Sequence, residues 1–177
     1  MFNFNNIKIF LIIIFFQLSF SEEMRIITYN VDKKNIESNE SLIDISIKSD
    51  IDIYGLQFDL SYNYKELFLN DSNIQSKISG INLYSKITNE GKVRIIMFSL
   101  SGDKIVDLSQ KNISSIINIY FSSVGNFIGT SHLELYNIIF AGKGGEEFFI
   151  SNHEFNIIFD LPKSSSLSQN TPNPFSE

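Results

Sequence analysis

The alternation of apolar and polar residues is clearest in Ile51–Asn63, which reads I-D-I-Y-G-L-Q-F-D-L-S-Y-N. Successive side chains of a strand point to opposite faces, so an apolar residue at every second position indicates a strand with one buried face. The apolar residues occupy odd positions through Ile53 and even positions from Leu56. One extra residue would keep both halves on the same core, and glycine tolerates such a bulge. The pattern predicts a long central strand with a structural bulge at Gly55; two short strands joined by a turn at Tyr54-Gly55 are the alternative.

Short segments with the same two-residue period recur along the chain. A polar connection is expected over Lys33–Ser41, and apolar residues of both parities in Gly91–Leu100 predict a strand covered on both faces. Without a convincing 3.6-residue period, the sequence predicts an all-β protein, a single antiparallel β-sandwich of about nine strands. Besides the central stretch, the predicted strands are Arg25–Val31, Leu42–Lys48, Gly91–Leu100, Ile116–Phe121, Leu133–Phe140, Glu146–Ile150 and Phe155–Phe159, with a short or edge strand within Ile78–Ile87.

Composition supports this assignment and excludes several kinds of function. The chain of 177 residues holds 30 Ile and 17 Phe but a single Ala, which suits pleated sheets better than helices. An AT-rich genome also favours Ile and Phe, so the periodicity is the stronger evidence. The formal net charge is −6 without a long run of either sign, which argues against nucleic-acid binding. Because cysteine is absent, disulfides, thiol nucleophiles, zinc–thiolate sites and lipid attachment to an N-terminal cysteine are excluded.

The first 21 residues have the organisation of a secretory signal peptide. Lys8 supplies the positive charge, Ile9–Phe16 forms the apolar core, and Ser19 and Ser21 are the small residues before a cleavage site. The apolar run is shorter than the ~20 residues of a membrane span. We therefore expect cleavage before Glu22, export through the Sec pathway, and a secreted or cell-surface protein without a membrane span; an uncleaved anchor is the alternative. At the other end, residues 162–168 are predicted to be a Ser-rich linker.

Three motifs in the predicted strands make the chain similar to a cohesin module. They are G-L-Q-F-D-L-S-Y-N at Gly55–Asn63, G-K-V-R-I-I-M-F-S-L-S-G at Gly91–Gly102, and L-E-L-Y-N-I-I-F-A at Leu133–Ala141. The resemblance covers residues 24–161 and implies a nine-stranded jelly-roll sandwich related to some cellulose-binding modules. Cohesins hold dockerin-bearing enzymes on a scaffold. The resemblance therefore implies a non-catalytic, monomeric module that binds a dockerin-like protein in an extracellular, polysaccharide-degrading assembly.

The resemblance also implies a partner-binding site on the central strand. In cohesins this strand contributes to the face that receives dockerin, with Asn and Asp at the positions matching Gly55 and Gln57. Here glycine and glutamine stand instead, so the family's charged hydrogen-bond acceptor is missing at Gln57. With Leu56, Phe58, Leu60 and Tyr62 facing the core, the candidate partner-binding residues on the outer face are Gln57, Asp59 and Ser61. A plain solvated strand face is the alternative.

The tail Gln169–Phe175, Q-N-T-P-N-P-F, resembles the opening Q-N-Y-P-N-P-F of the C-terminal sorting domain that the type IX secretion system reads. Thr171 replaces the usual tyrosine, and the sequence stops at Glu177, before the strands that would complete such a domain. The resemblance implies that residues 169–177 begin a truncated sorting domain, either in a fragment of a longer gene or as a degenerate signal. An ordinary proline-containing tail is the alternative.

No catalytic constellation stands out in the sequence. Ser131 and His132 are neighbours in a predicted strand and point to opposite faces, so they cannot pair as nucleophile and base. His132 and His153 are expected as exposed turn or edge residues. Asp50–Gly55 superficially resembles a calcium loop but lacks the oxygen ligand at the fifth position and has Ser61 where the bidentate Glu should be, and Gly142–Gly145 suits a hairpin. Several carboxylates could in principle supply the acid–base pair of a glycoside hydrolase, but solvation at the surface explains them better. They are Asp59, Asp103, Asp107, Glu146 and Glu147. We expect no enzyme activity, no cofactor and no metal.

Tyrosines are the remaining candidates for binding. Five of them could form an aromatic strip for sugar rings or anchor a protein partner, namely Tyr54, Tyr64, Tyr84, Tyr120 and Tyr136. Packing in the core or at a sheet edge accounts for most of them. Tryptophan, the residue best suited to stacking on polysaccharide, is absent. A cohesin-like protein-recognition module is therefore the favoured function, and a carbohydrate-binding module that attaches directly to polysaccharide is the alternative.

Overall fold

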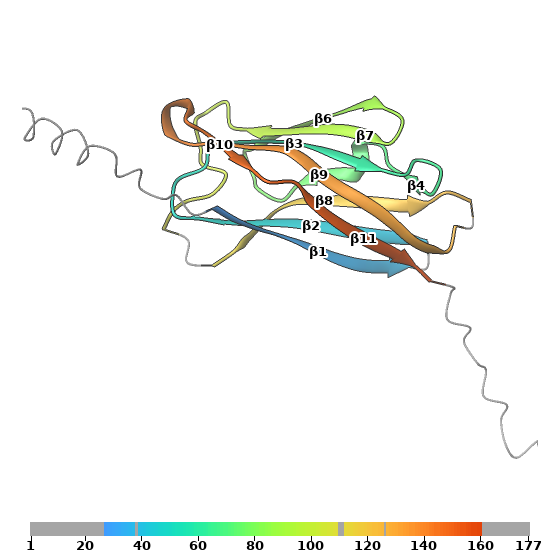
Figure 1. The fold of residues 1–177 in the computed structure, drawn as a ribbon. Helices are drawn as coiled ribbons and strands as arrows, with labels where there is room; N and C mark the ends of the chain where they lie inside the picture. The colour runs from blue at the N-terminus through green and yellow to red at the C-terminus, as the bar shows by residue number, and fades with distance from the viewer. Residues whose placement is uncertain (1–26, 38, 110–111, 126, 161–177) are drawn as a thin grey trace, which may run out of the picture.

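Two antiparallel sheets packed face to face form the fold of this computed structural model (Figure 1). The structure describes residues 27–37, 39–109, 112–125 and 127–160. The five-stranded sheet has the order β1-β2-β8-β4, with β5 also paired to β8. Its strands are β1 (Ile27–Glu37), β2 (Glu40–Ser49), β8 (Ser114–Ser123), β4 (Leu67–Phe68) and β5 (Ile74–Ser76).

The six-stranded sheet has the order β10-β9-β3-β7-β6, and β11 pairs with β9 outside this path. Its strands are β3 (Gly55–Tyr62), β6 (Asn82–Asn89), β7 (Lys92–Phe98), β9 (Gly129–Ala141), β10 (Glu147–Ile150) and β11 (His153–Phe159). Two short 3-10 turns, η1 (Asp71–Asn73) and η2 (Lys143–Gly145), lie in the connections. The predicted all-β sandwich is confirmed. The described residues form eleven strands rather than about nine, because β4 and β5 are only two and three residues long.

The core between the sheets consists of the inward-facing residues of every long strand. The prediction of which β3 side chains face the core is confirmed. At most 9% of each is exposed in the case of Leu56, Phe58, Leu60 and Tyr62. The facing strand β2 buries Ile43, Ile45 and Ile47 in the same alternating manner. Burying each such side chain stabilises the fold by about 1.5–3 kcal/mol, which accounts for the dominance of Ile and Phe.

The predicted bulge at Gly55 is wrong. β3 begins at Gly55 and pairs with β7 in unbroken register, while Ile53 forms an isolated bridge with Val106 outside the sheets. The apolar residues change from odd to even positions because Ile53 pairs with Val106, whereas the chain from Gly55 onward pairs with β7 and β9. The alternative interpretation, a turn between two short extended segments, therefore fits better. The bulge lies instead on β9, where Asn137 has a φ of 51° and the register shifts opposite Gln57 and Asp59.

Two other predictions need correction. Most of the polar connection expected over Lys33–Ser41 belongs to β1 and β2, which pair with each other up to Glu37 and Glu40. Edge strands with a solvated face tolerate such polar residues. The strand expected in Gly91–Leu100 is not covered on both sides: its inner residues are buried, but Ile96 and Phe98 are half-buried and Leu100 is 79% exposed.

The predicted signal peptide, Ser-rich linker and sorting-domain resemblance lie outside the described residues and stay predictions. Within the part of the chain that the structure describes, no helix is long and apolar enough to cross a membrane.

Candidate functional site

The outer face of the six-stranded sheet carries a row of mainly apolar side chains that crosses five strands. Directly opposite residues in antiparallel strands point to the same face, so the pairing register defines the row. It runs from β6 through β7, β3 and β9 to β10, and consists of Tyr84, Ile96, Gln57, Ile139 and Phe149. Tyr84 and Phe149 are 56% and 72% exposed, whereas Ile96 and Ile139 are half-buried. We call these five residues the apolar row, and Gln57 lies at its centre.

Asp59, the second predicted site residue, lies beside the apolar row but is covered. The Arg94 guanidinium donates to both of its carboxylate oxygens, from Nε at 2.7 Å and Nη2 at 2.8 Å. Asn137 Nδ2, at the bulge of β9, donates to the same carboxylate at 2.9 Å. Only 6% of Asp59 is exposed, while 47% of the Arg94 side chain is. A partner at this point would therefore meet the guanidinium rather than the carboxylate.

The charge of Asp59 is stabilised within the module. The hydrogen bonds from Arg94 lower the pKa of Asp59 below its ordinary value, against the opposing effect of burial, and the Asn137 amide adds to the lowering. Burial raises the pKa of the neighbouring Tyr136, with a contribution from Asp59. The ion pair of Asp59 and Arg94 thus stays charged around neutral pH. Ser61, the third predicted residue, is half-buried on the same face opposite Lys92 and Glu134.

A second feature of this face is a hollow of about 460 Å³ next to the apolar row. Gly55 pairs with Phe98 on one side and with Ala141 on the other, and these residues line the hollow together with Tyr54 and Gly142–Gly145. Gly55 has no side chain and Ala141 has only a methyl group, so this space stays open. Tyr84 stacks on Phe98 with ring centroids 5.5 Å apart and an interplanar angle of 11°. We call this hollow the anchor pocket, because its apolar lining suits a bulky apolar side chain of a partner.

Charged groups flank the apolar row unequally. Lys86, Lys92 and Arg94 project from β6 and β7, on one side of the face. Glu134 and Glu154 face outward from β9 and β11, on the other side. The sheet therefore offers a largely apolar centre with a basic flank and an acidic flank, and an apolar centre inside a polar rim is the usual organisation of a protein-binding surface.

The two histidines differ from each other in environment. His132 is 60% exposed in its side chain and contacts Asn156 Oδ1 through Nδ1 at 3.1 Å, as an exposed strand residue would. His153 opens β11 and is half-buried, and its ring lies 5.5 Å from the Tyr29 ring in an edge-on arrangement. His153 thus lies on an edge strand, as expected, but it is half-buried rather than exposed and packs against Tyr29 of β1.

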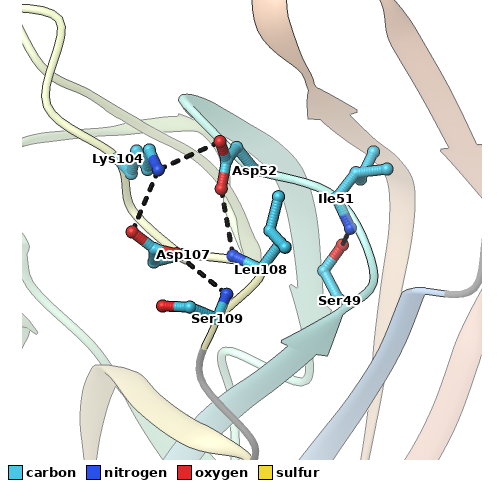
Figure 2. A network of polar contacts seen from close by, with 7 residues as sticks. All are labelled: Ser49, Ile51, Asp52, Lys104, Asp107, Leu108 and Ser109. Carbon is cyan, nitrogen blue, oxygen red and sulfur yellow. Dashed lines mark hydrogen bonds and ion pairs between the residues drawn. The ribbon is translucent and has the colours of Figure 1, made fainter.

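The carboxylates at the end of the sandwich hold two segments together. Figure 2 shows Lys104 Nζ between Asp52 Oδ2 and Asp107 Oδ2, each at 3.0 Å. The Leu108 backbone N–H donates to Asp52, and the Ser109 backbone N–H donates to Asp107 at 2.8 Å. The Ser109 hydrogen bond and then Lys104 lower the pKa of Asp107 to about 2. A carboxylate that stays ionised cannot serve as a general acid at neutral pH.

The other predicted carboxylates lie in separate places. Asp103 accepts from the hydroxyls of Ser99 and Ser101 in the turn after β7, whereas Glu146 and Glu147 are exposed immediately before β10 and at its first position. Asp59 is bound to Arg94 on the sheet. Among the described residues, no three histidine, aspartate or glutamate side chains are grouped so that they could hold a metal ion.

The five tyrosines do not form one strip. Tyr84 and Tyr136 lie on the outer face of the six-stranded sheet, Tyr54 lines the anchor pocket, and Tyr64 is exposed in a loop. Tyr120 lies on the outer face of the other sheet. Sequence reasoning missed Arg94, Ile96, Ile139 and Phe149, although each has the outward parity of its strand, which was the available signal.

Comparison with solved structures identifies the fold. No family model matches the chain, and no curated protein matches its sequence. A cohesin module from a family 33 glycoside hydrolase of Clostridium perfringens superposes with a TM-score of 0.60 at 18% identity, over 77% of this chain and 96% of that one. The seventh ScaB type I cohesin from Pseudobacteroides cellulosolvens gives 0.57 at 19% identity, over 77% and 95%.

A third neighbour was solved with a partner bound. It is the sixth cohesin of scaffoldin B from Acetivibrio cellulolyticus, in complex with a mutant Cel5 dockerin, and it superposes with a TM-score of 0.55 at 11% identity, over 75% of this chain and 99% of that one. At these identities the likeness establishes the fold alone. The fold is that of the cohesin jelly-roll sandwich.

Proposed function

We propose that this chain is a protein-recognition module that binds a dockerin-type partner on the outer face of its six-stranded sheet. The apolar row is the observation that carries the proposal, because it exposes two large aromatic side chains, Tyr84 and Phe149, at the ends of a row whose inner positions are two half-buried isoleucines and the central Gln57. Exposed apolar groups of this kind are unfavourable on a surface that only meets water, and they mark interaction sites when polar residues surround them. The cohesin fold and the dockerin complex of one neighbour support the choice of partner.

The surface predicts how this module differs from cohesins in specificity. The anchor pocket exists because glycine occupies position 55, where cohesins have asparagine, and it would accept an apolar side chain. The exposed Arg94 guanidinium and Lys86 would pair with an acidic group or a carbonyl of the partner. A matching partner therefore presents a bulky apolar residue next to an acidic or hydrogen-bond-accepting one. The signal-peptide-like residues 1–21 support a secreted or surface-displayed location, in which the partner would be an enzyme of a polysaccharide-degrading assembly.

Calorimetry with purified dockerin modules encoded in the same genome tests this proposal. Tyr84→Ala and Phe149→Ala should each weaken the binding of a cognate dockerin, and the double variant should lose about 2 kcal/mol or more, which is about 30-fold. Both side chains are mostly exposed, so the fold should tolerate their removal. Ile158→Ala is the matched control, because Ile158 is a 49% exposed apolar residue on β11 of the same sheet. Failure of every dockerin to bind, or an equal loss in the control, would refute the proposal.

A further inference from the structure

The outer face of the five-stranded sheet has its own hollow, on the opposite side of the sandwich from the apolar row. Its volume is about 210 Å³. Four elements meet there, since β2, η1, β5 and β8 all contribute to the lining. Its lining includes Glu40, Ser72, Asn73, Gln75, Tyr120 and Ser122. We call this hollow the Tyr120 hollow.

The walls of the Tyr120 hollow are held in place by side-chain hydrogen bonds. Asn73 Nδ2 donates to the backbone carbonyl of Tyr120 at 3.1 Å, which fastens η1 to β8. Asn70 caps η1, and its Oδ1 accepts from the Asn73 backbone N–H at 3.2 Å. Gln75 pairs with Asn118 across β5 and β8. These contacts hold η1 and β5 against β8, so the backbone frame of the hollow is in place before any ligand binds, which lowers the entropic cost of binding.

The polar groups of the hollow leave hydrogen-bonding capacity for a ligand. Asn118 Nδ2 donates to the Tyr120 hydroxyl oxygen at 3.3 Å, so the hydroxyl keeps its own proton to donate. Within the described residues, the side chains of Gln75 and Glu40 have no hydrogen-bond partner. An amide supplies both a donor and an acceptor, and a carboxylate supplies acceptors only. This mixture matches a ligand whose own groups both donate and accept.

The charge and shape of the hollow narrow the ligand class further. Glu40 is the single charged residue among the described lining residues, and none of them is basic, which disfavours phosphates and other anions. The Tyr120 ring offers an apolar surface beside the polar groups. A pyranose ring has the complementary chemistry, because its hydroxyls donate and accept while its C–H groups pack on an aromatic ring. The hollow is smaller than the ~300–1,000 Å³ of most ligand pockets, which suits a single ring.

We propose that the Tyr120 hollow binds one ring of a neutral polysaccharide. The module would then be bivalent, with a protein partner on the six-stranded sheet and a glycan on the five-stranded sheet. The glycan site does not depend on the proposed protein partner, because the two sites lie on opposite faces.

Native gel electrophoresis in gels that contain a soluble polysaccharide tests the glycan site. Hydroxyethylcellulose, xylan, glucomannan and soluble starch serve as the probes, and a gel without polysaccharide is the reference. At least one probe should retard the unaltered module. Gln75→Ala should weaken this retardation at least tenfold in dissociation constant without affecting folding, since Gln75 is exposed. Tyr120→Ala should abolish it, and Tyr120→Phe should reduce it while the ring is retained.

Tyr84→Ala is the matched control, because it removes a tyrosine from the opposite face and should leave retardation unchanged. The proposal would be overturned if none of the four polysaccharides retards the module. It would also be overturned if Gln75→Ala and Tyr120→Phe bind as the unaltered module does, or if Tyr84→Ala weakens binding equally. Dockerin affinity measured by calorimetry should be unchanged in Gln75→Ala, whereas a loss would place the dockerin in the Tyr120 hollow and overturn the assignment of this hollow to a glycan.

Discussion

Replacing Gly55 with valine should destabilise the sandwich through contact with β9 and not through backbone strain. Gly55 does not have a positive φ, so valine can adopt its backbone conformation. A Cβ at residue 55, however, would lie 3.1 Å from the Cβ of Ala141, its directly opposite partner. Carbon atoms pack best at about 3.5–4.0 Å. Overpacking of this kind costs about 1–3 kcal/mol, and the higher β propensity of valine offsets about 0.5–1 kcal/mol. We therefore expect a net loss of about 0.5–2 kcal/mol.

Urea unfolding followed by circular dichroism measures this loss as a lower midpoint with an unchanged slope. The Ala141→Gly background removes the opposing Cβ and supplies the control. In that background Gly55→Val should cost about 1 kcal/mol less, because the two substitutions are coupled through one contact. The same substitution fills part of the anchor pocket, so it should also weaken a cognate dockerin in calorimetry. An unchanged midpoint, or an equal loss in both backgrounds, would show that Gly55 and Ala141 are not in close contact.

Two further predictions concern pH and export. Asp59 has a lowered pKa in the folded state, so its contribution to stability is present above the pKa of the unfolded chain and is lost as the pH falls through the folded value. Asp59→Asn should therefore lower the urea midpoint at pH 7 and reduce the further drop between pH 4 and pH 2; an equal acid-induced drop in both proteins would contradict this role for the pair with Arg94. The mature protein should begin at or near Glu22, which N-terminal sequencing of exported protein checks, and an intact Met1 on membrane-bound protein would indicate an anchor instead.

The sequence by itself was enough to determine the class of fold and most of the inward-facing residues. The period of two in Leu56–Tyr62 and Ile43–Ile47 identifies the buried face of β3 and β2, because strand geometry alone decides which side a residue takes. The same parity places Gln57, Asp59 and Ser61 outward, as the structure has them. Local patterns are informative here because the alternation requires no knowledge of which strands pair.

Tertiary structure decided which residues lie next to each other. The carboxylate of Asp59 is covered by Arg94 and Asn137, which are 35 and 78 residues away in the sequence, so its local alternation indicated a solvated residue. The apolar row likewise combines single residues from five strands, and each of them looks like an ordinary outward residue in its own segment. The bulge belongs to Asn137 on the neighbouring strand and not to the glycine whose parity suggested it. Pairing order and register depend on long-range contacts, and these create both the covered ion pair and the candidate binding face.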